Sequence, residues 1–532
     1  MLVLAFVQCY RTVHDLHWAY EPDFDRDIGY IRNILDGHFG QDPNLAGQYL
    51  WYNPLMYMTE TGIVKLTGLP INIVVARAGM FLNLLSPIAF FIMLVKLFDY
   101  RIALAGLLSF IFLANGNLPG WGGATYSPWL LADCFVQFIF YVNIYLCYKA
   151  YKEQQLIWFA ILGAVIGIGF LGHAAPTIIM ILILILLQGQ KMIDSVKHKD
   201  YKALRTFFIQ GVVTLIPFLI FSFPFLYYIV GKYQMHFINR IILECAPGIF
   251  ARKDTLELIK VNLSIPLLIS IIGFVWFYKN YQEKLIRKII LNWLYITLIL
   301  YAYSSIVPTA DKILHINLPD TIPAVHYFFY LKGVQSLFFS FGFIYLLKLV
   351  FKILAKRKTE SNFFKFSNNW VIAIILLYAL AYYPIYSHRQ DFTEPRQQAL
   401  DKEKRKDDLD IYDYISQKLP LDKVILCQYG QSLFPVMATG MKMVSIEVYF
   451  SNPYVSFDAR EKDRETMLDY LTGSSNESAT AAEKLFKDYK VSYILLTNPI
   501  FEKYKNPPFA TSTVVFKNNK YTLLALSGYK TI

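Results

Sequence analysis

The sequence predicts a polytopic α-helical membrane protein that carries a small α/β domain at its C-terminal end. Hydrophobic residues make up 55% of the 532 positions, and the mean hydropathy of +0.38 lies above the range of ordinary soluble proteins. Apolar runs of bilayer-spanning length recur up to residue 388, and the composition then changes abruptly. Together these three observations indicate a membrane region followed by a soluble domain.

The basic excess and the cysteines exclude several other classes of protein. A net charge of +12 in so apolar a chain indicates cytoplasmic loops that follow the positive-inside rule, not nucleic-acid binding. The five cysteines are scattered without a ligand spacing, so neither a disulfide framework nor a zinc site is expected from them. The N-terminal "MLVLAFVQC" is too short to span a bilayer and lacks the marks of a cleavable signal peptide. We expect it to be an incomplete first helix.

Membrane helices are predicted from the apolar runs, which follow one another along the chain. They lie near residues 73–97, 101–114, 127–149, 156–189, 206–230, 260–278, 289–307, 328–351 and 369–388. The fourth run would be roughly 50 Å long as one helix, against a hydrocarbon core of about 30 Å. Its centre reads "GFLGHAAP", so we expect two short helices around His173 and Pro176.

The charge of the connecting loops supports this division. The most basic loops, at 191–205, 279–288 and 352–358, should all face the cytoplasm. They fall on one side only if run 156–189 makes two crossings, which gives about 11 transmembrane helices. Residues 45 and 450 should then be outside and residue 195 inside. We therefore expect an integral multi-pass protein of a bacterial cytoplasmic (inner) membrane.

Two domains are predicted from the change in composition. Residues 1–390 should form the transmembrane module, with 11–72 as its first external loop, and residues 391–532 a soluble extracytoplasmic α/β domain. In that second domain "KVILC", "KMVSIE" and "VSYILLT" read as short buried strands, and "TVVFKNNKYTLLAL" as a closing hairpin. This domain offers no cluster of carboxylates or histidines, so we expect a cap without catalytic residues.

The stretch "EPDFDRDIGYIRNIL" places four alternating carboxylates, Glu21, Asp23, Asp25 and Asp27, beside the first hydrophobic segment. Such a cluster at the start of a surface helix suits the helix dipole, and it is often only a solvated cap. The residues that follow include "WYNPLMYMTETGIVKL", with an aromatic-Pro-Leu element at Trp51 to Leu55 and a second surface helix.

This pattern resembles the first external loop of GT-C fold glycosyltransferases, in particular the protein O-mannosyltransferase and aminoarabinose transferase group. The matching residues are Asp23, Arg26 and Asp27, then Tyr52 and Pro54, while Phe24 stands where the family usually has Glu. The resemblance implies a GT-C-like fold and an inverting transfer of a sugar from a polyprenyl-phosphate carrier to an acceptor on the extracytoplasmic face.

The same resemblance implies roles for these residues. Asp23 would be the base that takes the acceptor proton, because a polyprenyl phosphate needs no protonation to leave. Asp25 and Asp27 are alternatives, for acceptor binding or for a divalent cation if one is used. Arg26 and Tyr52 would bind substrate. No cofactor is certain.

Further candidates for substrate binding lie at the predicted external ends of later helices. Asp133 sits two turns inside an apolar run, where a carboxylate is costly. His173 lies at the helix break, and each of these two is equally well a wetted or helix-ending polar residue. Cations that break the positive-inside pattern could cradle a phosphate. They are Arg240, Lys312, His326 and Lys332, and each alone could instead be a snorkelling residue.

The partners expected are a polyprenyl-phosphate sugar, the bilayer and an acceptor that could be a glycan, a lipid or a protein. The alternative function is a transporter or flippase of lipid-linked sugars or oligosaccharides. Transporters concentrate polar residues near the midplane on broken helices, whereas the ionisable residues here gather at the external surface. The sequence therefore favours an enzyme.

Overall fold

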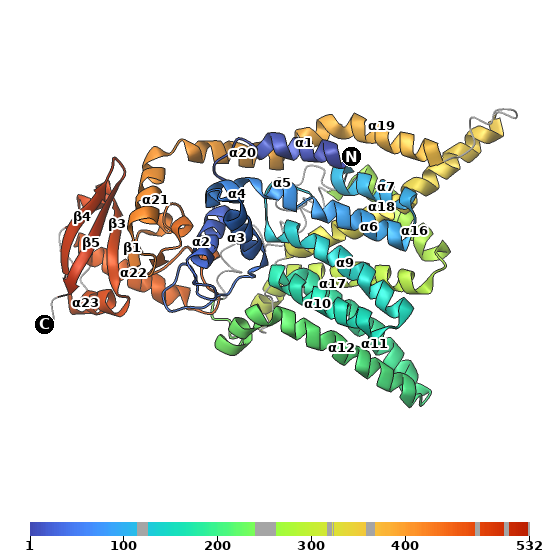
Figure 1. The fold of residues 1–532 in the computed structure, drawn as a ribbon, viewed down its shortest axis with the longest axis horizontal. Helices are drawn as coiled ribbons and strands as arrows, with labels where there is room; N and C mark the ends of the chain where they lie inside the picture. Colours follow the sequence, from blue (N-terminus) through green and yellow to red (C-terminus); the bar gives the residue numbers. More distant parts are fainter. Residues whose placement is uncertain are drawn as a thin grey trace. The chain divides into compact units, whose positions relative to one another are not determined.

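The computed structural model describes residues 1–113, 126–239, 262–315, 322, 324–357, 368–473, 479–504 and 510–529. These residues divide into two compact units, shown in Figure 1. The helical unit consists of Met1–His14, Arg77–Pro224 and Pro247–Glu394. The mixed unit consists of Asp15–Ala76, Phe225–Ala246 and Pro395–Ile532.

Each apolar run predicted from the sequence contains helix in the described residues. The helices of this part of the chain are α1 (Leu2–Val13), α5 (Gly79–Leu82), α6 (Leu85–Leu97), α7 (Tyr100–Leu108) with η1 (Ser109–Leu113), α9 (Ala132–Glu153), α10 (Leu156–Gly172), α11 (Ala174–Lys197), α12 (Tyr201–Leu226), α16 (Ile265–Asn280), α17 (Lys284–Leu314), α18 (Ala324–Arg357) and α19 (Asn368–Ser387). Within the ranges that the structure describes, six segments are long and apolar enough to cross a membrane, and four more apolar helices are shorter. The number of eleven crossings stays a prediction.

The predicted break in run 156–189 is confirmed. Helix α10 ends at Gly172 and α11 begins at Ala174, with His173 in an extended conformation between them. The ring of His173 accepts a hydrogen bond from the backbone N–H of Ala175 through Nδ1, at 3.1 Å. The histidine therefore caps the helix that follows it.

Three helix ends carry the basic loops, and Figure 1 shows them at one end of the helical unit, on the right. They are the turn from α11 to α12, the turn from α16 to α17 and the end of α18. The positive-inside scheme requires this grouping, because all three loops must face one side of the bilayer.

We therefore predict that a cysteine placed at Lys199 is labelled from the cytoplasm, and cysteines at Gln41 and Lys462 from outside. All three side chains are exposed, so differences in labelling by a membrane-impermeant thiol reagent report sidedness and not burial. Labelling of positions 199 and 462 from the same side would overturn the topology.

The mixed unit is built on a five-stranded sheet of order β2-β1-β3-β5-β4. Strands β2 (Lys442–Met443), β1 (Val424–Cys427) and β3 (Val491–Thr497) are parallel, and β5 (Tyr521–Tyr529) pairs antiparallel with β3 and with β4 (Ala510–Lys517). The short strands and the closing hairpin predicted from the sequence are thus confirmed. The helical elements of the unit are α2 (Asp23–Leu35), α3 (Leu55–Thr67), α4 (Ile71–Arg77), η2 (Tyr227–Lys232), α20 (Gln390–Glu403), α21 (Lys406–Lys418), η4 (Tyr429–Gln431), η5 (Met437–Thr439), η6 (Val448–Phe450), α22 (Phe457–Thr472), α23 (Ala479–Asp488) and α24 (Asn498–Phe501).

The first external loop folds together with the C-terminal segment, although the composition of the chain predicts that the two belong to different domains. Leu45 is buried in one apolar core with residues of β1, β2 and β3, and the carbonyl of Asn44 accepts a hydrogen bond from the N–H of Met443. Helix α2 also packs against η5, and a Cβ atom on Gly29 would collide with the backbone oxygen of Met437. The tail therefore helps to build the segment that carries the predicted base.

Candidate functional site

The acidic run forms the first turn of α2, which begins at Asp23 directly after Pro22. The three carboxylates differ sharply in exposure. The side chain of Asp23 is 43% exposed, whereas those of Asp25 and Asp27 are 0% and 1% exposed. Of the three, Asp23 is the one that an acceptor could reach from solvent.

Arg26 links the exposed carboxylate to a buried one. Its guanidinium group contacts Asp23 at 3.0 Å and Asp27 at 2.8 Å, and it lies 4.4 Å from the ring centroid of Tyr52. A planar guanidinium is suited to these contacts, because its several N–H groups can reach both carboxylates while its flat face lies over the ring. The structure thus brings together four of the residues selected from the sequence.

The carboxylate of Asp25 is buried and contacts a side chain of the protein instead of solvent. Its Oδ1 accepts a hydrogen bond from the buried ammonium of Lys402, and among the described residues its Oδ2 has no hydrogen-bond partner. Burial raises the pKa of Asp25 to about 7, against the lowering effect of Lys402. In this arrangement Asp25 cannot meet an acceptor.

A polar face of α3 lies against the same part of α2. Tyr57 and Tyr30 stack with ring centroids 4.6 Å apart, and Glu60, one turn further along α3, is 1% exposed. Burial raises the pKa of Asp27 to about 6, and it raises that of Glu60 well above the ordinary value, with a further contribution from Asp27. Glu60 therefore holds its proton more tightly than an exposed glutamate does.

A second cluster lies in the helical unit and joins three residues that were selected separately from the sequence. Asp133, at the start of α9, contacts Nε2 of His173 at 3.0 Å and Nδ1 of His326, in the first turn of α18, at 2.7 Å. The two imidazole centroids are 4.7 Å apart. These three side chains, 193 positions apart along the chain at their widest, form what we call the Asp133 cluster.

The hydrogen bonds of the Asp133 cluster define one histidine tautomer. Because Nδ1 of His173 accepts the Ala175 N–H, the ring proton must lie on Nε2, which donates to Asp133. The ligand atoms of the cluster lie within 4.8 Å of one another, as a metal site would need. A cation bound at Nε2 of His173 would displace this proton toward Nδ1 and break the cap of α11. Asp133 and His326 therefore suit a cation better than His173 does.

The remaining candidates are placed as follows. Lys332 is buried in α18, where its ammonium donates to the side-chain oxygen of Asn262. Lys312 lies in α17, but its side chain is outside the described part of the structure, and Arg240 lies outside the described residues altogether. Of the phosphate cradle expected from the sequence, the structure describes the side chains of His326 and Lys332.

Sequence reasoning missed two side chains that complete the acidic site. Lys402 comes from the charged run "DKEKRKDD", which reads as a linker, and no local signal distinguishes it from its exposed neighbours. Glu60 follows Tyr57 at helical spacing, and that spacing was the one hint that it shares a face with an aromatic residue. Both become evident only when α2, α3 and α20 are brought together.

Comparison with solved structures identifies the fold. ArnT from Cupriavidus metallidurans, determined with bound undecaprenyl phosphate, matches with a TM-score of 0.57 at 12% identity, over 98% of this chain and 96% of that chain. The oligosaccharyltransferase AglB from Archaeoglobus fulgidus, in complex with an inhibitory peptide and a dolichol-phosphate, matches with a TM-score of 0.51 at 12% identity, over 93% of this chain and 69% of that chain. No protein-family model and no curated protein matches the sequence. The chain is therefore an integral multi-pass membrane protein with the fold of the GT-C glycosyltransferases.

Proposed function

We propose that the protein is a membrane glycosyltransferase that moves a sugar from a polyprenyl-phosphate carrier to an acceptor on the extracytoplasmic face of a bacterial cytoplasmic membrane. The observation that supports this most is the likeness to ArnT with undecaprenyl phosphate, which extends over nearly the whole of both chains. The carboxylate run at the start of α2 supplies the chemistry that such a transfer needs.

The transfer requires one base and no acid. The carrier phosphate leaves as an anion, so the acceptor hydroxyl or amine must lose a proton as it attacks the anomeric carbon. Asp23 is suited to take that proton, because it is accessible and Arg26 holds its carboxylate in place. A single displacement of this kind inverts the anomeric configuration.

The departing phosphate gains charge and needs cations close to it. The Asp133 cluster and Lys332 offer two candidate donors, the ring of His326 and the buried ammonium. Should a divalent cation take part, Asp133 and His326 would hold it, and it would stabilise the same negative charge.

The direct test is to incubate the purified protein with a panel of labelled polyprenyl-phosphate sugars and candidate acceptors, and to follow release of the lipid phosphate. We expect one donor to be consumed in an acceptor-dependent way. If no donor is consumed, but reconstituted vesicles move lipid-linked sugars between leaflets, the protein is a flippase and the transferase proposal is wrong.

A further inference from the structure

Helix α20 and the turn that follows it run along the segment that leads into α2. Arg396 forms two hydrogen bonds with the carboxylate of Asp15, at 2.7 and 2.8 Å. The carboxylate of Glu403 accepts the backbone N–H groups of His17 and Trp18, at 2.6 and 3.0 Å. The C-terminal segment therefore holds this stretch by charged contacts spaced along its length.

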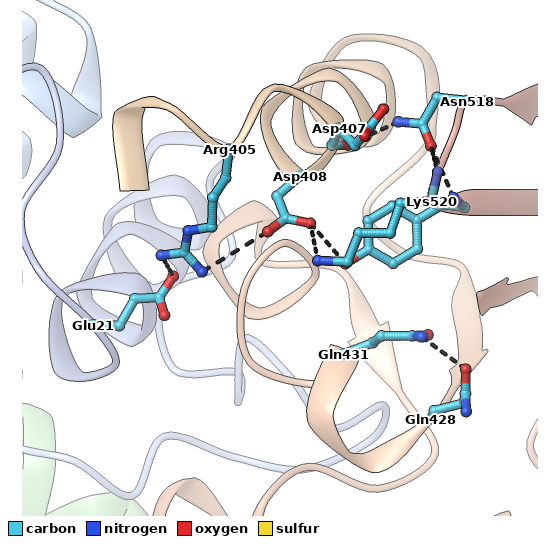
Figure 2. Close-up of polar contacts among 9 residues, drawn as sticks. Glu21, Arg405, Asp407, Asp408, Gln428, Gln431, Asn518 and Lys520 are labelled. Carbon is cyan, nitrogen blue, oxygen red and sulfur yellow. Dashed lines mark hydrogen bonds and ion pairs between the residues drawn. The ribbon is translucent and has the colours of Figure 1, made fainter. Parts of the chain in front are cut away.

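Two further contacts reach the start of α2 itself. Arg405 donates to the carboxylate of Glu21 at 2.6 Å, as Figure 2 shows, and Lys402 donates to Asp25. We call Arg396, Lys402, Glu403 and Arg405 the α20 brace. Its contacts are with residues between Asp15 and Asp25. Two of the contacted residues, Glu21 and Asp25, lie on either side of the predicted base, Asp23, in the sequence.

The acidic first turn of α2 suits the helix dipole, but no side chain caps the helix, so contacts such as those of the brace are what hold its first turn. The residue at its N-cap is Pro22, which makes no side-chain capping bond, whereas Ser, Thr, Asp or Asn would cap the first N–H groups. The direction of the first turn is therefore set by tertiary contacts.

Lys402 is enclosed so that its ammonium stays with Asp25. Its side chain is 0% exposed, and the ammonium lies 5.1 Å from the ring centroid of Trp18 and 4.4 Å from that of Phe434. If the ammonium is removed, Asp25 is a buried carboxylate without a compensating charge. Asp25 then takes up a proton or is hydrated by opening of the first turn, and in either case the charged contact that ties this turn to α20 is lost and Asp23 is held less firmly.

The brace is in turn anchored in the sheet. Arg405 lies 3.8 Å from Asp408 of α21, and Asp408 accepts hydrogen bonds from Lys520 at 2.6 Å and from the hydroxyl of Tyr521 at 2.8 Å (Figure 2). A chain of ion pairs thus joins the β4–β5 hairpin to the residue before Pro22.

We propose that Lys402 and Arg405 are positioning residues of the transferase, which fix the first turn of α2 so that Asp23 meets the acceptor. This inference rests on the proposed function. It assigns the C-terminal segment a part in building the active site, whereas the sequence predicted a cap without catalytic residues.

The test compares Lys402→Met and Arg405→Gln with the control Lys404→Met in the full-length protein. Lys404 lies between the two, in the turn after α20, but is 70% exposed, and its side chain contacts Asp401. Two quantities are measured: hydrogen–deuterium exchange of residues 15–35, and the kcat and KM for donor and acceptor. We expect both brace variants to speed exchange in the first turn of α2 and to lower kcat by roughly 10- to 100-fold, with the donor KM unchanged.

A third variant separates positioning from a general loss of stability. Asp25→Asn combined with Lys402→Met removes both charges, so it should slow the exchange again and recover part of kcat. If Lys402→Met alone does not fold, the proposal is tested with this double variant and with Arg405→Gln.

Unchanged exchange in Lys402→Met and Arg405→Gln would overturn the brace, and so would faster exchange with wild-type kcat. If the wild-type protein transfers no sugar, the proposed function fails, and the exchange measurement alone then decides whether the brace holds α2.

Discussion

Asp23→Asn should lower the turnover of the purified protein by about 100-fold or more, because the amide keeps the size of the side chain but cannot accept a proton. Folding should change little, since the side chain is 43% exposed. Donor affinity should also stay near that of the wild type, because the base acts on the acceptor. Steady-state kinetics with a saturating donor, and a separate donor-binding measurement, check both expectations.

The matched control for this variant is Asp36→Asn. Asp36 lies at the C-terminal end of the same helix, is 39% exposed and pairs with Arg32, so it reproduces the loss of one exposed, paired carboxylate. Near wild-type turnover in both variants would show that the acidic run is only a solvated cap.

Asp25 and Asp27 behave differently in this scheme because both are buried partners of cations. Asp25→Asn leaves the ammonium of Lys402 buried without its partner, and Asp27→Asn removes one of the two carboxylates on Arg26. We expect these variants to lose stability first and turnover second. If Asp25→Asn instead lowers turnover more than Asp23→Asn in a protein of normal stability, the base is Asp25 and the first turn must open during catalysis.

The second large effect is expected at the phosphate. His326→Ala and Lys332→Ala each remove a charge-assisted contact worth roughly 1.5–3 kcal/mol, so donor affinity should fall by about 10- to 150-fold. Competition binding with an unlabelled polyprenyl phosphate measures this directly, without turnover.

Lys352→Ala is the control for these two variants, since Lys352 lies on the same helix with its side chain exposed, in the basic segment predicted to face the cytoplasm. Donor affinity should be unchanged in it. Wild-type donor affinity in His326→Ala and Lys332→Ala would show that neither residue binds the phosphate and that both are polar groups of the helix packing.

The position of the helices could be predicted from the sequence because the signal is local. Runs of apolar residues identify membrane helices by their length alone, and the basic loops identify which helix ends lie on the same side of the membrane. Even the break at His173 was predictable, since a single helix of that length would exceed the hydrocarbon core. The strands of the tail followed in the same way from short apolar runs between turns.

The grouping of site residues depended on contacts between distant parts of the chain. Asp133, His173 and His326 were each selected for a local reason, a charge in an apolar run, a helix break and an unexpected external cation. Both imidazoles contact the same carboxylate because of the way α9, α11 and α18 pack together. No local sequence pattern encodes that packing.

The sequence by itself determined that this is a helical membrane protein with an acidic run beside its first apolar segment and an α/β tail. Only the tertiary structure decided which carboxylate of that run is open to solvent. The three differ in exposure because Lys402, 377 positions beyond Asp25, comes from the tail to enclose one of them, while Arg26 holds another inside. Periodicity along a helix cannot reveal this, because the burial of a charge is settled by the partner that compensates it, and here that partner is remote in sequence.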